Sequence, residues 1–161
     1  MKIADIYKHL QKFDSSIVLE EDTNYLIIDY SNWLEIAKEL KSNKDLSFDY
    51  LMCITSYDLG SGKLGLAYNL HSNDKKHSLE IKIEFDQLVE IPSVTSIWKS
   101  ANWMEREVYD LFGIKFSGHP DLRRILLPEG WHGYPLRKDY DIKLQDQSWI
   151  REHLKIRKTP N

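Results

Sequence analysis

Residues 48–85 read FDYLMCITSYDLGSGKLGLAYNLHSNDKKHSLEIKIEF, and they carry the strongest strand pattern of the chain. In the segment 77–85, apolar residues alternate with polar or charged ones, which predicts a strand with one face in solvent. In the segment 64–70, large apolar residues occupy alternate positions (Leu64, Leu66, Tyr68 and Leu70), which predicts another strand. The segment 48–57 is apolar on both pleat faces, which predicts a central strand covered on both sides. These three strands are expected to form the framework of a sheet.

The segment 60–63, Gly-Ser-Gly-Lys, lies between the first two of these strands and has the composition of a phosphate-binding loop. That motif also requires a glycine at position 57 and a Ser or Thr at position 64. The chain has Tyr57 and Leu64 there. The segment is therefore predicted to be a hairpin turn.

Further elements are expected on both sides of this framework. The segment 3–13 places its apolar residues on one helical face, and so does 33–40. The segments 17–19 and 25–30 are typical of short strands around a polar turn. Residues 1–112 are thus predicted to form an α+β body, in which helices pack on a mixed or antiparallel sheet of about five strands.

A third helix is expected over residues 93–112, with Ser93 as its N-cap. Helical spacing places a broad apolar stripe on one face, made of Val94, Ile97, Trp98, Ala101, Met104, Val108, Leu111 and Phe112. Glu105 falls inside that stripe. The residues predicted to point away from the stripe are Trp103, Arg106, Glu107 and Asp110.

Glu105 is an unusual residue for an apolar stripe, because a buried carboxylate needs a charged or hydrogen-bonding partner. The nearest cationic candidates along the sequence are Arg123, Arg124 and Arg137. We therefore expect Glu105 to pair with one of them and so to clamp the C-terminal segment to the body. A role as a proton carrier ranks below this, since no second titratable group is spaced to work with Glu105.

Trp103 lies on the polar side of the same helix and allows two interpretations of equal weight. Tryptophan is enriched at interface hot spots, so an exposed Trp103 would mark a partner contact. Alternatively, the C-terminal segment covers the indole within the same chain.

The character of the chain changes after the third helix. Residues 113–161 are interrupted repeatedly by Gly and Pro and carry 10 Lys/Arg against 6 Asp/Glu, whereas residues 1–112 carry 12 against 19. Long irregular segments are uncommon inside compact domains and are often functional or partner-bound. We expect residues 113–161 to form an irregular basic docking arm with a short helix near 147–157. An arm that folds back on its own acidic body is the plainer alternative.

The residue types also limit the chemistry of this chain. The single cysteine, Cys53, lies in an apolar run and is expected to be a small buried hydrophobic residue. One thiol cannot form an internal disulfide or supply the several thiolates of an iron–sulfur cluster. His119, His132 and His153 are not at metal-ligand spacing, and no catalytic or nucleotide-binding motif is present. No catalytic, cofactor-binding or metal-binding residue is therefore assigned.

Charge and hydropathy argue against two further classes. A formal net charge of −3 does not suit a general nucleic-acid binder. No stretch approaches the about 20 apolar residues that span a bilayer, and the first residues lack the apolar core of a signal peptide. Attachment to a membrane is therefore expected only through partners.

Two stretches carry a family resemblance. Residues 103–128 read WMEREVYDLFGIKFSGHPDLRRILLP, and residues 133–140 read GYPLRKDY. The region 98–140 as a whole resembles the signature of the C-type, or 30 kDa, component of NADH:quinone oxidoreductase (respiratory complex I). The elements of that signature follow in order: a Glu-Arg-Glu run, an Asp-Leu-hydrophobic-Gly-Ile run, a Gly-His-Pro-Asp-Leu-Arg-Arg-Ile run and a closing Gly-x-Pro-Leu-Arg-Lys-Asp.

The resemblance implies a cofactor-free structural subunit in the peripheral, hydrophilic arm of a proton-pumping complex on the cytoplasmic face of the bacterial inner membrane. FMN and the Fe–S clusters are then expected in partner subunits, and the isolated chain is expected to have no catalytic site of its own. The implied partners are the quinone-site (D, 49 kDa-type) subunit and the Fe–S subunits B and I. The residues assigned to arm folding and partner contact are Trp103, Glu105, Arg106, Glu107, Asp110, His119, Asp121, Arg123, Arg124, Arg137, Lys138 and Asp139.

Two other interpretations of the function stay open at this point. The chain also suits the equivalent position in a membrane-bound hydrogenase or in another donor:quinone complex, because other subunits set the electron donor. A free-standing adaptor or a small soluble enzyme that uses Glu105 or His119 would predict turnover, or a bound metal, in the purified chain.

Overall fold

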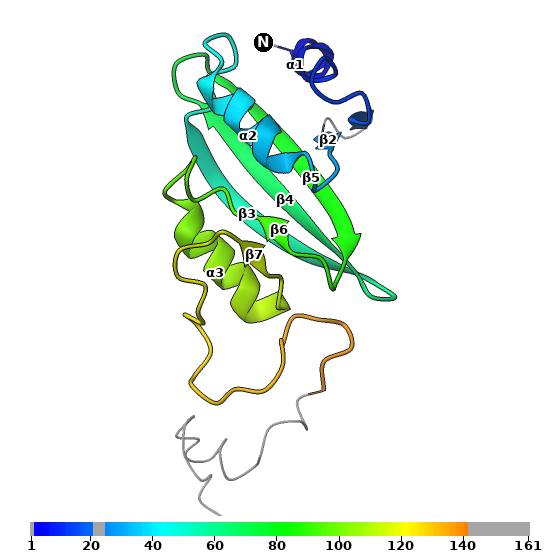
Figure 1. The fold of residues 1–161 in the computed structure, drawn as a ribbon, viewed down its shortest axis with the longest axis vertical. Helices are drawn as coiled ribbons and strands as arrows, with labels where there is room; N and C mark the ends of the chain where they lie inside the picture. Colours follow the sequence, from blue (N-terminus) through cyan, green and yellow to red (C-terminus); the bar gives the residue numbers. More distant parts are fainter. Residues whose placement is uncertain (1, 21–24, 142–161) are drawn as a thin grey trace, which may run out of the picture.

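The computed structural model describes residues 2–20 and 25–141 (Figure 1). The helices in these residues are α1 (Ile3–Leu10), α2 (Trp33–Ser42) and α3 (Ala101–Phe112). The strands are β1 (Val18–Glu20), β2 (Tyr25–Ile27), β3 (Tyr50–Gly60), β4 (Lys63–Ser72), β5 (His77–Asp86), β6 (Ile91–Pro92) and β7 (Phe116–Ser117).

The first five strands form one mixed sheet in the order β1-β2-β5-β4-β3. β3, β4 and β5 are antiparallel neighbours, β2 joins β5 in parallel, and β1 joins β2 antiparallel. The turn between β3 and β4 is the predicted hairpin, in which Gly60 pairs with Lys63. Gly60 and Gly62 both adopt a positive φ, which glycine tolerates without strain. The predicted α+β class with about five strands is confirmed.

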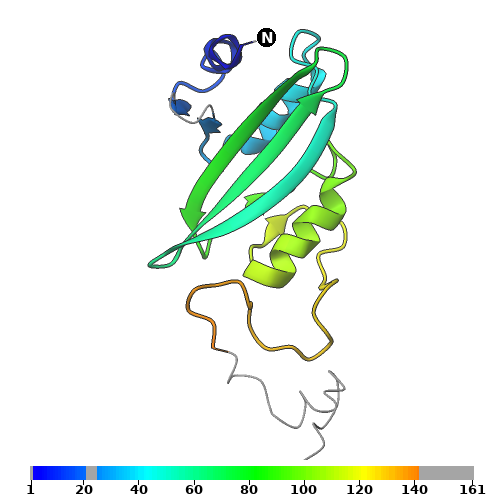
Figure 2. The same ribbon diagram turned by 180° about the vertical axis from the view of Figure 1, so that it is seen from behind.

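The two faces of this sheet are covered differently. Figure 1 shows α2 lying across the sheet and α3 beside β3, whereas Figure 2 shows the opposite face of β3, β4 and β5 with no helix over it. The buried side chains of β5, including Ile81 and Ile83, join Trp33 of α2 and Trp98 in one core. On the other face of β5, Glu84 is exposed. β5 therefore has the single solvent-facing side that its alternation predicts.

β3 lies at the edge of the sheet, so the prediction of a central covered strand is wrong. Among the described residues its only strand neighbour is β4, and Tyr50, Met52 and Cys53 are exposed. Cys53 is therefore not the buried hydrophobic residue expected, because a register irregularity between Leu51 and Cys53 leaves two consecutive side chains exposed. The strand buried on both faces is β4, over residues 64–68.

α3 begins at Ala101, later than the predicted start at residue 93. The residues before it form turns, and β6 pairs in parallel with β7. Ser93 is not the N-cap of the helix. Its hydroxyl donates instead to the carboxylate of Glu105, at 2.7 Å, because the chain before α3 lies against the face of that helix.

Two findings concern the described ranges as a whole. Within residues 2–20 and 25–141, no helix is long and apolar enough to cross a membrane. The same residues contain no group of three or more His, Cys, Asp or Glu side chains placed to hold a metal ion. The helix predicted near residues 147–157 lies outside the described residues.

Candidate functional site at the end of helix α3

The described part of the C-terminal arm, residues 113–141, returns to the body. The backbone N–H of Leu136 donates to the carbonyl oxygen of Leu111 in α3, at 3.2 Å. Two residues further on, the N–H of Lys138 donates to the carboxylate of Asp58 near the β3–β4 turn, at 2.8 Å. The arm is thereby tied both to α3 and to the long hairpin.

The last four carbonyl groups of α3 all accept hydrogen bonds from the residues that follow the helix. An α-helix leaves these groups without a partner of its own. The donors are Gly113 N–H to Tyr109 (2.8 Å), Arg124 Nη1 to Asp110 (3.2 Å), Leu136 N–H to Leu111 (3.2 Å) and Arg137 Nε to Phe112 (2.6 Å). Two of the donors are guanidinium groups, which also interact favourably with the negative end of the helix dipole. The arm is therefore the C-terminal cap of α3.

Gly113 and Tyr134 fix the path of the arm at this cap. Gly113 has a φ of +73°, and a Cβ atom there would lie 2.4 Å from the ring of Tyr134. The Tyr134 ring has the guanidinium groups of Arg124 and Arg137 within cation–π distance, each 5.2 Å from the ring centroid. Glycine is required here both by the backbone conformation and by the close approach of the ring.

Asp110 holds the middle of the arm. Its carboxylate accepts backbone N–H bonds from three successive arm residues at 2.7–3.0 Å, and a fourth bond from Arg124 at 2.9 Å. Burial would raise the pKa of Asp110, but these hydrogen bonds outweigh burial and hold the pKa below its usual value. The sequence places Asp110 on the side of α3 that faces away from the apolar stripe. Asp110 is nevertheless buried, because the arm covers that side of the helix.

Glu105 is buried as predicted, but the predicted arginine clamp is wrong. Its carboxylate accepts hydrogen bonds from the Ser93 hydroxyl at 2.7 Å and from the Val94 N–H at 2.8 Å. Burial raises the pKa of Glu105 to about 7, although the bonds from Ser93 and Val94 act in the opposite direction.

The three arginines predicted to clamp Glu105 have other partners. Arg124 and Arg137 bind groups at the C-terminal end of α3, more than a turn away from Glu105 along the helix. Arg123 binds the carboxylate of Asp121 at 3.0 Å. Arginines therefore do clamp the arm to α3, but they bind the end of the helix and not the predicted partner Glu105.

His119 is the group of the arm that approaches Glu105. Its side chain is fully buried, with Nε2 4.0 Å from the Glu105 carboxylate. Nδ1 accepts the N–H of Asp121 at 3.0 Å, and Nε2 lies 3.1 Å from the carbonyl oxygen of Asn102. This pattern assigns the ring proton to Nε2, which donates to the helix carbonyl. His119 therefore fastens the beginning of the arm to the N-terminal half of α3.

Arg106 is buried between the arm and Trp103. Its Nε donates to the carbonyl oxygen of Arg123 at 3.2 Å, and its guanidinium lies 4.9 Å from the centroid of the Trp103 ring. The indole itself is 64% exposed, so the described part of the arm does not cover it. Of the two interpretations, the surface-exposed one agrees with the structure, while a partner contact at Trp103 stays a prediction.

Apart from Glu105, whose partners are Ser93 and Val94, the residues predicted from the sequence divide into two groups. The arm and α3 bring together Arg106, Asp110, His119, Asp121, Arg123, Arg124 and Arg137. The exposed side chains outside this group are Trp103, Glu107, Lys138 and Asp139. Sequence reasoning missed Ser93 as the partner of Glu105, and it missed Gly113 and Tyr134 as parts of the cap. A glycine directly after a helix was the available signal for the last two.

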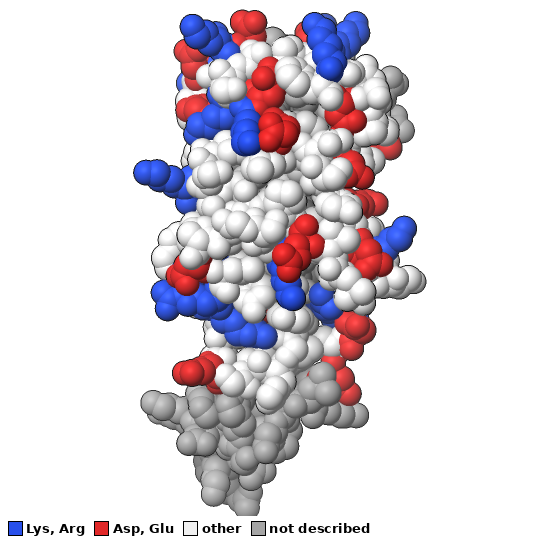
Figure 3. Space-filling model, in the orientation of Figure 1, with Lys and Arg blue, Asp and Glu red and all other residues white. Residues whose placement is uncertain are grey.

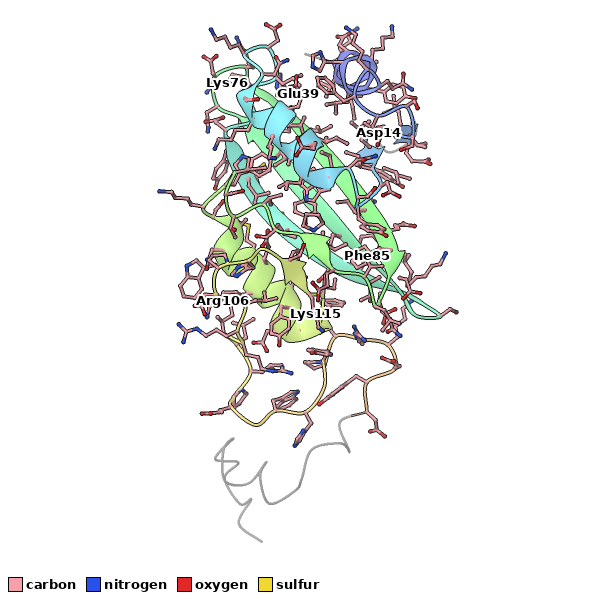
Figure 4. The ribbon with its side chains drawn as sticks, in the orientation of Figure 1. Asp14, Glu39, Lys76, Phe85, Arg106 and Lys115 are labelled. Carbon is pink, nitrogen blue, oxygen red and sulfur yellow. The ribbon has the colours of Figure 1, made fainter. Side chains whose placement is uncertain are left out.

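The anchored arm presents a surface of mixed character. Leu126 and Leu136 are exposed although the backbone beside them is tied to α3, and Trp103 is exposed on the helix itself. Figure 3 shows Lys and Arg side chains gathered over α3 and the adjoining arm, and Figure 4 places Arg106 in this region. A fixed backbone that carries exposed apolar and basic side chains is suited to docking on another protein.

Comparison with known proteins identifies the relatives of this chain. The family model for the respiratory-chain NADH dehydrogenase, 30 Kd subunit, matches residues 26–146. The C-type chain of the NADH-quinone oxidoreductase of Chloroherpeton thalassium is 47% identical over 113 residues, which are 69% of this chain and 47% of that protein. Its counterpart in Chlorobium phaeobacteroides is 44% identical over 120 residues, which are 73% of this chain and 72% of that protein. The chain thus spans from about half to about three quarters of the length of these two relatives.

Two solved structures share the fold. The trypsin-resistant fragment of Nqo5 superposes with a TM-score of 0.63 and 26% identity, covering 76% of this chain and all of the fragment. The membrane-bound sulfane sulfur reductase, an archaeal respiratory membrane complex, contains a chain with a TM-score of 0.69 and 19% identity. That match covers 98% of this chain and 94% of the other, and at this identity it shows the fold alone.

Proposed function

Because this chain belongs to the family of 30 Kd subunits of the respiratory-chain NADH dehydrogenase, we propose that it is a structural subunit in the peripheral arm of an NADH:quinone oxidoreductase. The complex passes electrons from NADH through FMN and Fe–S clusters to quinone and pumps protons. In this proposal the redox groups belong to partner subunits, and this chain has no catalytic site of its own. The single cysteine of this chain supports the assignment of the Fe–S clusters to partner subunits, since one thiolate cannot hold an Fe–S cluster.

The observation that supports this role best is the capping of α3 by the arm. Four carbonyl groups, two guanidinium groups and the buried carboxylate of Asp110 hold an irregular segment in one conformation. Ordering such a segment costs conformational entropy, which these bonds offset. The ordered segment exposes apolar side chains to solvent, chiefly Leu126 and Leu136. This arrangement favours binding to a partner protein over chemistry on a small molecule.

The partners that we propose are the quinone-site D-type subunit and the Fe–S subunits B and I. For the D-type subunit there is support among the relatives. The fused C/D chain of the NADH-quinone oxidoreductase of Phocaeicola vulgatus is 43% identical over 107 residues, and the match covers 21% of that longer protein. A C-type and a D-type sequence that are joined in one chain lie near each other. We propose attachment to the cytoplasmic face of the bacterial inner membrane through these partners.

Purification of the assembly from native membranes through a tag on this chain tests the proposal, with the partners identified by mass spectrometry. The expected partners are a D-type subunit and subunits that bind NADH and flavin. A nickel-site subunit in their place would favour a hydrogenase-type complex. Turnover by the isolated chain, or a stoichiometric metal or flavin bound to it, would overturn the structural role.

A further inference from the structure

We propose that the free edge of β3 is completed in the assembly by an extended segment of a partner subunit, which adds to the sheet as one more strand. This inference rests on the proposed function, and it names a further contact surface, which adjoins the cap of α3 at Leu136. The surface consists of the β3 edge over residues 50–57 and the groove between β3 and α3.

The first observation is a disagreement between the sequence of β3 and its position. Residues 50–57, Tyr-Leu-Met-Cys-Ile-Thr-Ser-Tyr, contain no charged residue and no proline. Edge strands usually carry such residues, because their free N–H and C=O groups otherwise pair with other chains. β3 has the composition of a covered strand, yet β4 is its only strand neighbour in the described part of the chain. The hydroxyl of Ser100 donates to the carbonyl oxygen of Leu51 at 3.5 Å. Beyond Leu51, the main chain of residues 52–57 has no hydrogen-bond partner outside β3 and β4 among the described residues. A partner that pairs with such an edge is itself extended main chain.

The second observation is the exposure of large apolar side chains on the same strand. Tyr50 is 51% exposed and Met52 is 48% exposed, and Cys53 beside them is exposed as well. The irregularity in the pairing with β4 exposes Met52 and Cys53 together. Side chains of an added strand on this side would lie beside these residues and remove them from water.

The third observation is a groove of about 190 Å³ on the opposite side of the same edge. Its walls are Ile54, Thr55 and Ser56 of β3, residues 107, 108, 111 and 112 of α3, and Leu136 of the arm. A cavity of about 150 Å³ accommodates a benzene molecule, so this groove holds one apolar side chain. Successive side chains of a strand point to opposite faces. One added strand therefore accounts both for the exposed residues and for the groove.

Charge favours a partner subunit over a second copy of this chain. Glu107 is exposed at the groove, and in the described residues no Lys or Arg lies within salt-bridge distance of it. Pairing of β3 with β3 of a second copy would bring two such carboxylates to one short interface, where like charges repel. An extended segment with a Lys or Arg opposite Glu107 and apolar residues around it fits both the charge and the groove.

Cys53 provides the test, because it is the only cysteine of the chain and lies on the proposed surface. Alkylation is followed by mass spectrometry of this subunit, once in the isolated full chain and once in the intact assembly. Labelling is expected to slow by about tenfold or more in the assembly, since the thiol is then reached only after local opening. Equal rates in the two forms would overturn the proposal. If Cys53 is already protected from alkylation in the isolated chain, a segment of this chain itself covers the thiol, and the proposal is overturned as well.

A pair of variants separates strand addition from general surface effects. Thr55→Lys places a charge on the edge, where lysine blocks strand pairing, and is expected to reduce incorporation into the assembly severalfold. Leu88→Lys changes a residue that is 87% exposed in the turn after β5, and is expected to leave incorporation unchanged. The inference is contradicted if Thr55→Lys is incorporated normally. It is also contradicted if the isolated chain forms a dimer and Thr55→Lys abolishes that dimer. If the unmodified chain does not co-purify with the complex, the proposed function itself fails.

Discussion

Arg137 donates a hydrogen bond from Nε to the carbonyl oxygen of Phe112, the last residue of α3, at 2.6 Å. The two residues are 25 positions apart in the sequence, and the bond closes the arm onto the helix that precedes it. A second nitrogen of the same guanidinium, Nη1, donates to the side chain of Gln87 at 3.1 Å, so one side chain links the helix, the arm and the turn after β5.

Arg137→Ala is expected to lower the free energy of unfolding by about 1–3 kcal/mol, because it removes charge-assisted hydrogen bonds at the helix end. Hydrogen exchange of the arm amides is expected to accelerate with it. Urea denaturation and exchange mass spectrometry measure the two effects. Arg123→Ala is the control, since this side chain is 73% exposed and its ion pair with Asp121 is worth little. Equal losses in the two variants would contradict the capping role.

Asp110→Asn is expected to destabilise the chain by about 2–4 kcal/mol, because a neutral amide replaces a carboxylate that accepts four hydrogen bonds. The folded pKa of Asp110 is lower than the unfolded one. Its contribution is therefore present above the unfolded pKa and is lost as the pH falls through the folded pKa. Stability measured below about pH 4 is expected to decline less steeply in Asp110→Asn than in the unmodified chain. Parallel pH curves for the two proteins would refute this assignment.

Glu105→Gln is expected to reduce the dependence of the unfolding free energy on pH at higher pH values than Asp110→Asn does. Burial raises the folded pKa of Glu105 to about 7, from an ordinary value of 4.5. The proton is therefore bound more tightly in the folded chain, and stability is lost as the pH rises from the unfolded toward the folded pKa. Glutamine does not titrate, so the difference in unfolding free energy between variant and unmodified chain is expected to change across this window. A constant difference measured by urea denaturation at several pH values would show that Glu105 does not titrate there.

Gly113→Ala is expected to cost more than Gly118→Ala, although the two glycines have similar positive φ angles of +73° and +77°. A Cβ at Gly113 would meet the Tyr134 ring at 2.4 Å, whereas nothing lies within 4 Å of a Cβ at Gly118. The conformational cost alone is about 1–2 kcal/mol, and the ring contact adds to it at Gly113 only. Thermal unfolding of the two variants, together with exchange rates in the arm, measures the difference. Equal costs would mean that Tyr134 moves aside freely.

Trp103→Ala is expected to lower the stability of the isolated chain by no more than about 1 kcal/mol, because its indole is mostly in solvent and loses only its contact with Arg106. If Trp103 anchors a partner, association weakens by about 2 kcal/mol or more. Leu88→Ala is the matched control, an exposed apolar residue in a distant turn. A binding measurement with the purified partner, or the yield of co-purification, decides the point. If Trp103→Ala associates normally with the partner, the indole of Trp103 is not part of the docking surface.

Much of the fold follows from local pattern. The alternation over 77–85 predicts β5, the turn composition at 60–63 predicts the hairpin, and the apolar face of 33–40 predicts α2. Burial of Glu105 also follows from the helical projection. These predictions hold because the side-chain period of a helix or strand is set by its own backbone geometry. The start of α3 could not be predicted in this way, since Glu105 stabilises a turn where the pattern alone allows a longer helix.

Local sequence pattern therefore accounts for the α+β class, for most of the elements and for many residues of the site, but not for Ser93, Gly113 and Tyr134. Local pattern does not give the donor that each carboxylate meets, nor the position of β3 at the edge of the sheet. Glu105 binds Ser93 and Val94, while Asp110 binds Arg124, although both acids lie on one helix and either arginine pairing suits the spacing. The reason is physical: such pairings depend on where the chain returns in space, and the order of strands depends on contacts across the whole domain, which local periodicity does not encode.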